Sequence, residues 1–135
     1  MKNQEIHAAL RELKRKGKVK FTGVDLGGPE IESVIKAVIE MGAFDVVLCP
    51  VDSQRWNKLE PLLKQAKAKG IGVLGKRVLE GARGANLDAF KKDTKSYAQA
   101  ALRWALSFPV IDAVVVDMPS YENVQEYVGA SVKKA

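Results

Sequence analysis

Hydrophobic positions along this chain alternate between helical spacing and short, unbroken apolar runs. Apolar residues three to four positions apart predict helices over residues 4–16, 29–41, 54–69, 94–107 and 120–132. Short β-prone runs between them predict strands over Val19–Val24, Asp45–Cys49, Ile71–Gly75 and Ile111–Val116. Glycines such as Gly17, Gly42 and Gly70 stand where the predicted helices end.

The order of these segments predicts the fold class. One helix is followed by four strand–helix units, which implies right-handed crossovers and a parallel sheet. We therefore expect an α/β fold, a single domain over residues 1–135 with four parallel strands in sequential order. The run DVVLC at 45–49 is typical of a strand buried on both faces. Pro29 suits the first position of a helix, and Pro61 allows the third helix to begin near Leu59.

Composition excludes several classes of protein. The chain has 135 residues, of which 47% are hydrophobic, enough to bury a core. It contains no apolar run of membrane-spanning length, so we expect no membrane partner. Its first residues lack the apolar region of a secretory signal. The single Cys49 excludes an internal disulfide and suits a reducing compartment, so the expected localisation is cytoplasmic.

The net charge of +6 raises the question of a nucleic-acid or anionic partner. The lysines are spread along the predicted helices, and aromatic residues do not alternate with them as a base-stacking surface requires. Solvated helix faces explain this distribution, so nucleic acid is not an expected partner.

Four segments carry a resemblance to a known family. They are ALRELKRKGKVKFTGVD at 9–25, FDVVLCPVD at 44–52, LLKQAKAKGIGVLGKRVLEG at 62–81 and ALRWALSFPVIDAVVVDMPSYENVQEYVGA at 101–130. In this order and spacing they resemble the C-terminal half of the aldo-keto reductases. ALRWALS followed by a strand is the most specific piece, and it is closest to the branch that often carries an iron–sulfur domain.

The resemblance implies half of a (β/α)8, TIM-type barrel. In that family the catalytic aspartate, tyrosine, lysine and histidine lie on the first four strands, and no motif here matches them. The family's reaction is the reduction of a carbonyl by a nicotinamide cofactor, with the tyrosine as proton donor. This chain has no counterpart of that tyrosine, so we assign no catalytic residue. We expect an aldo-keto reductase-like half barrel that is non-catalytic on its own, and whether any enzyme activity remains is open.

Positions that hold the nicotinamide cofactor in the family are also changed. Residues of other types stand at these positions: Asp25, Leu26, Leu48, Val51, Asp52, Lys76, Asp117 and Pro119. Leu48 cannot donate to an amide, and Asp117 repels a phosphate. No cofactor is expected, although the resemblance leaves NADP(H) possible.

Charged side chains nevertheless follow every predicted strand: Asp25, Asp52, Lys76, Arg77 and Asp117. Because parallel strands end on one side of a sheet, where ligands bind in such folds, we expect these residues to share one rim. They form either a site for a small anionic or polar ligand or for a cation, or a ring of salt bridges in which they neutralise one another. No metal site is expected, since no His or Cys cluster is present.

The remaining candidates have simpler explanations. We expect His7 to pack or lie at the surface, Cys49 to be an inert core thiol, and Trp56 and Trp104 to anchor packing. The loop from Gly81 to Gly84 fits either an anion contact or turn chemistry.

Self-association is the expected partnership. The outer strands of a half barrel, Val19–Val24 and Ile111–Val116, lack neighbours and are mostly apolar. A two-fold homodimer would restore eight strands around one core. The alternative is a flatter sheet with helices on both faces.

Overall fold

The structure is a computed structural model that describes residues 4–92 and 94–131. Its centre is a four-stranded parallel sheet in the order β1-β2-β3-β4. The strands are β1 (Gly23–Asp25), β2 (Val46–Pro50), β3 (Gly72–Lys76) and β4 (Ala113–Val114). The predicted α/β class and the sequential, parallel strand order are confirmed.

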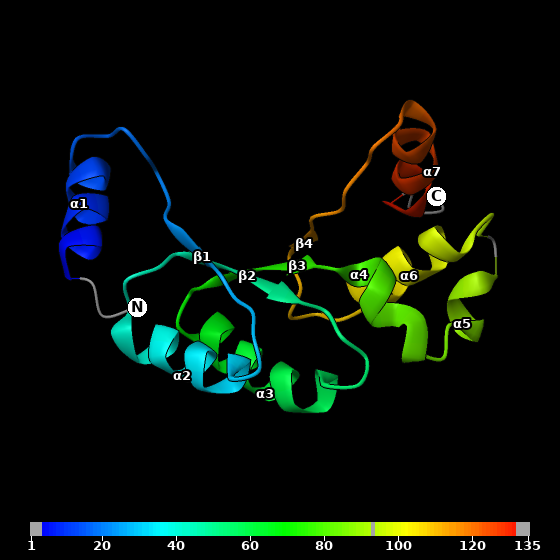
Figure 1. Ribbon diagram of the computed structural model, residues 1–135, viewed down its shortest axis with the longest axis horizontal. Helices are drawn as coiled ribbons and strands as arrows, with labels where there is room; N and C mark the ends of the chain where they lie inside the picture. The colour runs from blue at the N-terminus through cyan, green and yellow to red at the C-terminus, as the bar shows by residue number, and fades with distance from the viewer. Residues whose placement is uncertain (1–3, 93, 132–135) are drawn as a thin grey trace.

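Helices precede the first strand, connect the strands and follow the last one. They are α1 (Gln4–Arg15), α2 (Ile31–Met41), α3 (Trp56–Ala68), α4 (Val78–Gly81), the 3-10 turn η1 (Ala82–Gly84), α5 (Asp88–Lys91), α6 (Tyr97–Leu106) and α7 (Tyr121–Ser131). In Figure 1, α2 and α3 lie along one side of the sheet, whereas α1 and α7 rise on the other side at opposite ends of the molecule.

One face of the sheet forms the core and the other does not. Along β2 and β3, Val47, Cys49 and Val73 are buried together with the apolar residues of α2, α3 and α6. The residues between them stay only partly buried. The strand at 45–49 was expected to be buried on both faces, and that prediction is wrong. We call the less buried side, formed by Val46, Leu48, Leu74, Ala113 and Val115, the open face.

Both outer strands are shorter than predicted. Regular pairing in β1 is limited to Gly23–Asp25, and Phe21 just before it is 72% exposed. In β4 only Ala113 and Val114 are paired as strand, although the Val115 amide still donates to the Gly75 carbonyl at 2.8 Å. Each outer strand has a neighbouring strand on one side only. Its hydrogen-bonded pairing therefore stops where that single neighbour no longer lies beside it.

Three helical predictions also need correction. The second helix begins at Ile31, because Pro29 and Glu30 form the preceding turn. The third helix begins at Trp56 and includes Pro61. Proline has no amide hydrogen, so one helix carbonyl loses its donor. Pro61 is exposed, so water can reach that carbonyl. The helix predicted over 94–107 is shorter and forms α6. The charged segment before it, predicted as a loop, contains α4, η1 and α5.

The predicted packing role of the two tryptophans is confirmed. Trp56 and Trp104 are each only 7% exposed. Their rings pack against Phe108, with centroid distances of 4.3 Å from Trp56 and 5.2 Å from Trp104. This cluster joins α3, α6 and the turn that leads into β4.

Candidate functional site

An ion pair links the ends of β1 and β3. Asp25 is the last residue of β1 and Lys76 the last of β3, and the Lys76 ammonium binds an Asp25 carboxylate oxygen. The Lys76 side chain is 21% exposed, whereas that of Asp25 is 63% exposed. The pair therefore spans the end of β2, with the lysine largely enclosed and the carboxylate hydrated.

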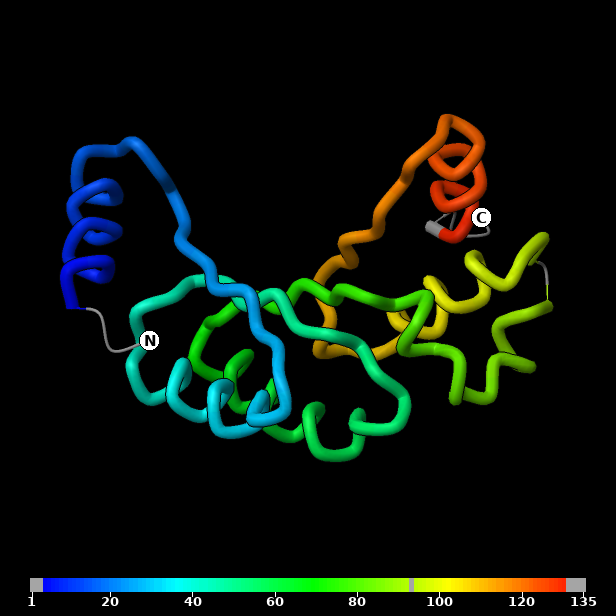
Figure 2. Tube along the Cα trace, viewed as in Figure 1, coloured from blue at the N-terminus to red at the C-terminus, as the bar shows by residue number. Residues whose placement is uncertain are grey.

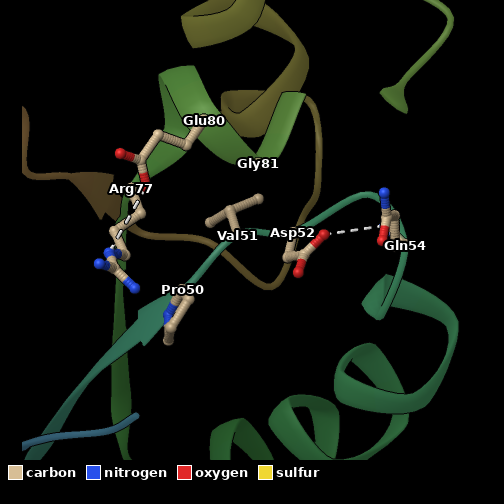
Figure 3. A pocket seen from close by; sticks show the side chains of 7 residues that line it. All are labelled: Pro50, Val51, Asp52, Gln54, Arg77, Glu80 and Gly81. Atoms are coloured by element: carbon tan, nitrogen blue, oxygen red, sulfur yellow. Dashed lines mark hydrogen bonds and ion pairs between the residues drawn. The ribbon is translucent and has the colours of Figure 1, made fainter. Parts of the chain in front are cut away.

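Asp52 has a local structural role. It lies two residues after β2, and its Oδ1 accepts a hydrogen bond from the Gln54 amide at 2.9 Å. The Asp52 carbonyl also accepts from the Arg55 amide at 3.2 Å. These bonds form a tight turn that leads into α3, and Figure 3 shows Asp52 turned toward Gln54.

Arg77 adopts an unusual backbone conformation. Its φ is 56°, and it is the only non-glycine residue with positive φ in the described chain, residues 4–92 and 94–131. Left-handed geometry is costly for a residue with a Cβ atom. Its side chain is 70% exposed, and its Nε lies 3.7 Å from Glu80 Oε2 (Figure 3). The guanidinium is therefore held only loosely by this partner.

The loops after β2 and β3 are joined through their backbones. The Ser53 amide donates to the Gly81 carbonyl at 3.0 Å. A Cβ atom at Gly81 would lie 1.8 Å from the Val51 carbonyl oxygen, so only glycine fits at this position. The predicted loop at 81–84 is thus a packed element of the rim, because Gly81 ends α4 against the β2 loop.

Lys76 and Arg77 both line two hollows. The first, about 300 Å³, is lined by Gly27, Gly28, Pro29, Ile31, Pro50, Asp52, Arg55, Leu59, Lys76 and Arg77. The second, about 490 Å³, is lined by Leu48, Lys76, Arg77, Val78, Leu79, Glu80, Val115, Val116 and Asp117. The two basic residues therefore face both hollows, and the second hollow borders the open face.

The five residues named from the sequence do lie along one rim, but they do not form a ring. Asp25 and Lys76 are the only two of them that bind each other within the described residues. Asp52 is used by its turn, and Arg77 pairs with Glu80. Asp117 lines the second hollow and is exposed. Mutual neutralisation therefore explains only one pair, and three charged side chains remain turned toward solvent or a hollow.

Sequence reasoning missed Arg55. Its guanidinium donates to the Pro29 carbonyl at 3.1 Å and to Glu32 Oε1 at 3.4 Å. These bonds tie the turn after β2 to the turn before α2, and they bring a third basic group into the first hollow. The position of Arg55 three residues after Asp52 was the available signal, since the turn places both beside the strand ends.

Other chemically distinctive residues do not form a second site. Burial raises the pKa of the Cys49 thiol to about 12, which confirms an unreactive core position. The His7 ring packs against Phe44 at 5.4 Å. Among residues 4–92 and 94–131, no group of three or more His, Cys, Asp or Glu side chains is arranged to hold a metal ion. No helix in the described part of the chain has the length and apolarity needed to cross a membrane.

Comparison of the chain with protein-family models and with curated protein sequences finds no match in either set.

Proposed function

We propose that this chain is a half barrel of the aldo-keto reductase type that is non-catalytic by itself and functions by associating with a second copy. The observation that carries this proposal is the one-sided sheet. Helices cover one face, and within the described residues β1 and β4 each pair with one neighbour only. A barrel needs further strands at both of these edges, and its interior face needs a partner to fill it.

Exposed apolar residues support association on this side of the sheet. Val115 on the open face is 49% exposed, Met118 beyond β4 is 46% exposed, and Phe21 before β1 is 72% exposed. Burial of several hundred Å² of such surface contributes roughly 10 kcal/mol at about 25 cal/mol per Å², before the cost of association. Two copies supply eight parallel strands, enough to close a barrel.

The rim supports the absence of catalysis. Leu48 occupies the open face where the family's carboxamide-binding glutamine is implied, and Asp25 is engaged by Lys76. The Tyr97 hydroxyl donates to the Leu79 carbonyl at 2.8 Å, so this tyrosine is tied to the backbone. No side chain on this rim resembles the family's proton donor.

Light scattering over a dilution series, combined with a reductase assay, tests the proposal. We expect a mass of twice 14.8 kDa at micromolar concentration, and no oxidation of NADPH or NADH above background with a panel of aldehydes and ketones. A compact monomer over the whole series contradicts self-association and favours the flatter sheet. Turnover that is lost in Lys76→Met contradicts the non-catalytic assignment.

A second candidate is binding of an anionic ligand, including a nicotinamide nucleotide, at the rim. The observation in its favour is the first hollow, where Arg55, Lys76 and Arg77 meet the glycine turn at 27–28. Calorimetric titration with NADP⁺ and with inorganic pyrophosphate tests this candidate. Binding of both that is lost in Lys76→Met supports a phosphate-binding rim, whereas no heat with either ligand at millimolar concentration removes it.

A further inference from the structure

Within residues 4–92 and 94–131, helix α1 contacts the rest of the chain through Lys14 and His7 on one side of the helix. None of its residues is buried. Lys14 binds the Asp45 carboxylate at 2.8 Å, and His7 packs against Phe44. Beside these contacts runs an apolar stripe of Ile6, Leu10 and Leu13, in which Ile6 is 56% and Leu13 is 40% exposed. An amphipathic helix of this kind gains most of its stability by packing its apolar stripe, and Leu13 and Ile6 of this stripe keep two fifths or more of their surface exposed.

Helix α7 has a similar exposed stripe. Its inner side packs on α6, where Gln99 Nε2 donates to the Glu126 carbonyl at 2.7 Å and Ala130 is buried. The neighbouring side carries Tyr121, Val124 and Val128, which are 70%, 38% and 57% exposed. These three residues recur at helical spacing, so they form one continuous apolar surface.

The two helical regions have opposite charge. Helix α1 itself carries three basic and two acidic side chains, and the segment from Lys16 to Thr22 adds three lysines and no acidic residue. Helix α7 carries Glu122 and Glu126 and no Lys or Arg. The two lysines that follow α7 in the sequence lie outside the described residues. Charge complementarity between two apolar surfaces favours their pairing and fixes which surface meets which.

The two helices lie at opposite ends of the molecule, so they do not meet within one chain (Figure 2). However, α1 leads into the β1 edge and α7 follows the β4 edge. In a two-fold dimer, the β4 edge of each copy can meet the β1 edge of the other. We call each of these two contacts a seam. At each seam, α7 of one copy lies near α1 of the second copy. We propose that α1 of one copy docks its apolar stripe on Tyr121, Val124 and Val128 of a second copy, at both seams.

This inference rests on the proposed self-association and assigns its contact surface and its specificity. A charge swap tests it. In the first variant, Arg11→Glu, Lys18→Glu and Lys20→Glu make the α1 region acidic. In the second, Glu122→Lys and Glu126→Lys make α7 basic. The control, Glu30→Lys with Glu40→Lys around α2, changes net charge as much as the second variant does, but away from the seam. Circular dichroism verifies that each protein is folded.

Analytical ultracentrifugation then measures the dissociation constants. We expect each seam variant alone to dimerise at least tenfold more weakly than wild type, because like charges meet at both seams. An equimolar mixture of the two variants should recover a heterodimer near wild-type affinity, and the control should match wild type. If wild type dimerises but both variants dimerise equally well, the α1–α7 contact is wrong while self-association stands. If wild type is monomeric at all concentrations, self-association itself fails and this contact with it.

Discussion

Asp45 and Asp112 make the same pair of contacts at the starts of β2 and β4. Asp45 Oδ2 accepts from the Thr22 amide of the preceding strand segment at 2.7 Å, and Asp112 Oδ2 accepts from the Val73 amide of β3 at 2.8 Å. Each carboxylate also binds a lysine from the helix before that preceding strand, Lys14 for Asp45 and Lys67 for Asp112. An aspartate therefore fastens each of the two outer strand pairs, β1–β2 and β3–β4.

These clamps make the fold sensitive to acid. Lys14 and then the Thr22 amide lower the pKa of Asp45, and Lys67 and then the Val73 amide lower the pKa of Asp112. Since both pKa values are lower in the folded state, unfolded carboxylates take up protons first. The contribution to stability is complete above the ordinary aspartate pKa of about 4 and is lost as the pH falls through the folded values.

Replacement of Asp112 by alanine tests the clamp. We expect Asp112→Ala to lower the free energy of unfolding by about 1–2 kcal/mol at pH 7, because the Val73 amide loses its acceptor. The difference from wild type should shrink below about pH 4. Urea unfolding at several pH values measures both effects. Asp117→Ala is the control, since that exposed carboxylate is not part of a clamp, and an equal loss in both variants would contradict the assignment.

Gly81 provides a steric test of the rim. We expect Gly81→Ala to destabilise the fold by about 3 kcal/mol, at the upper end of overpacking costs, because its Cβ would collide with the Val51 carbonyl. Thermal unfolding followed by circular dichroism measures the loss. Gly27→Ala is the matched control, since a Cβ there meets nothing within 4 Å. A melting temperature equal to that of the control would show that the two loops separate easily.

The Asp25–Lys76 pair is expected to matter little for stability. Lys76→Met keeps the apolar stem of the side chain and removes its charge, leaving a hydrated Asp25 carboxylate. We expect the free energy of unfolding to change by less than about 1 kcal/mol. Chemical denaturation of wild type, Lys76→Met and Asp25→Asn decides this. A loss of several kcal/mol in Lys76→Met alone would mean that the lysine neutralises another carboxylate besides Asp25.

Cys49 should not react in the folded protein. The thiol is fully buried and its pKa is raised to about 12 by burial, so thiolate is scarce at neutral pH. Titration with a chromogenic disulfide reagent at pH 8 should detect no thiol in the native state and one thiol in guanidinium chloride. Rapid modification of the native protein would show that β2 opens locally.

The alternation of strands and helices was sufficient to predict the sheet and its strand order, because each β-α unit carries its own hydrophobic pattern. The ends of the outer strands could not be predicted, since β-prone residues such as Val19 and Val116 continue the pattern beyond the residues that pair with a neighbouring strand. Apolar run 45–49 was misinterpreted for a related reason. A strand with one face in the core and the other face only partly buried can have the same apolar composition as a strand that is covered on both faces.

The rim residues could be placed from the sequence, because parallel strands end on one side. Which of them form ion pairs could not be predicted, since this depends on how the side chains extend across the end of β2. Lys76 binds Asp25 there rather than Asp52. The left-handed conformation of Arg77 was equally hidden, because such geometry is normally signalled by glycine or asparagine. The clamps at Asp45 and Asp112 did leave a signal, an apolar residue, aspartate, an apolar residue and valine in both segments.

Sequential strand order has a consequence for how the chain folds. Each strand pairs only with its neighbours along the chain, so no strand has to insert between two that are already formed. During synthesis the sheet can therefore grow in the order in which the strands leave the ribosome, with each new strand templated by the one before it. Contacts of this kind have moderate sequence separation, which favours rapid folding compared with sheets that pair distant strands.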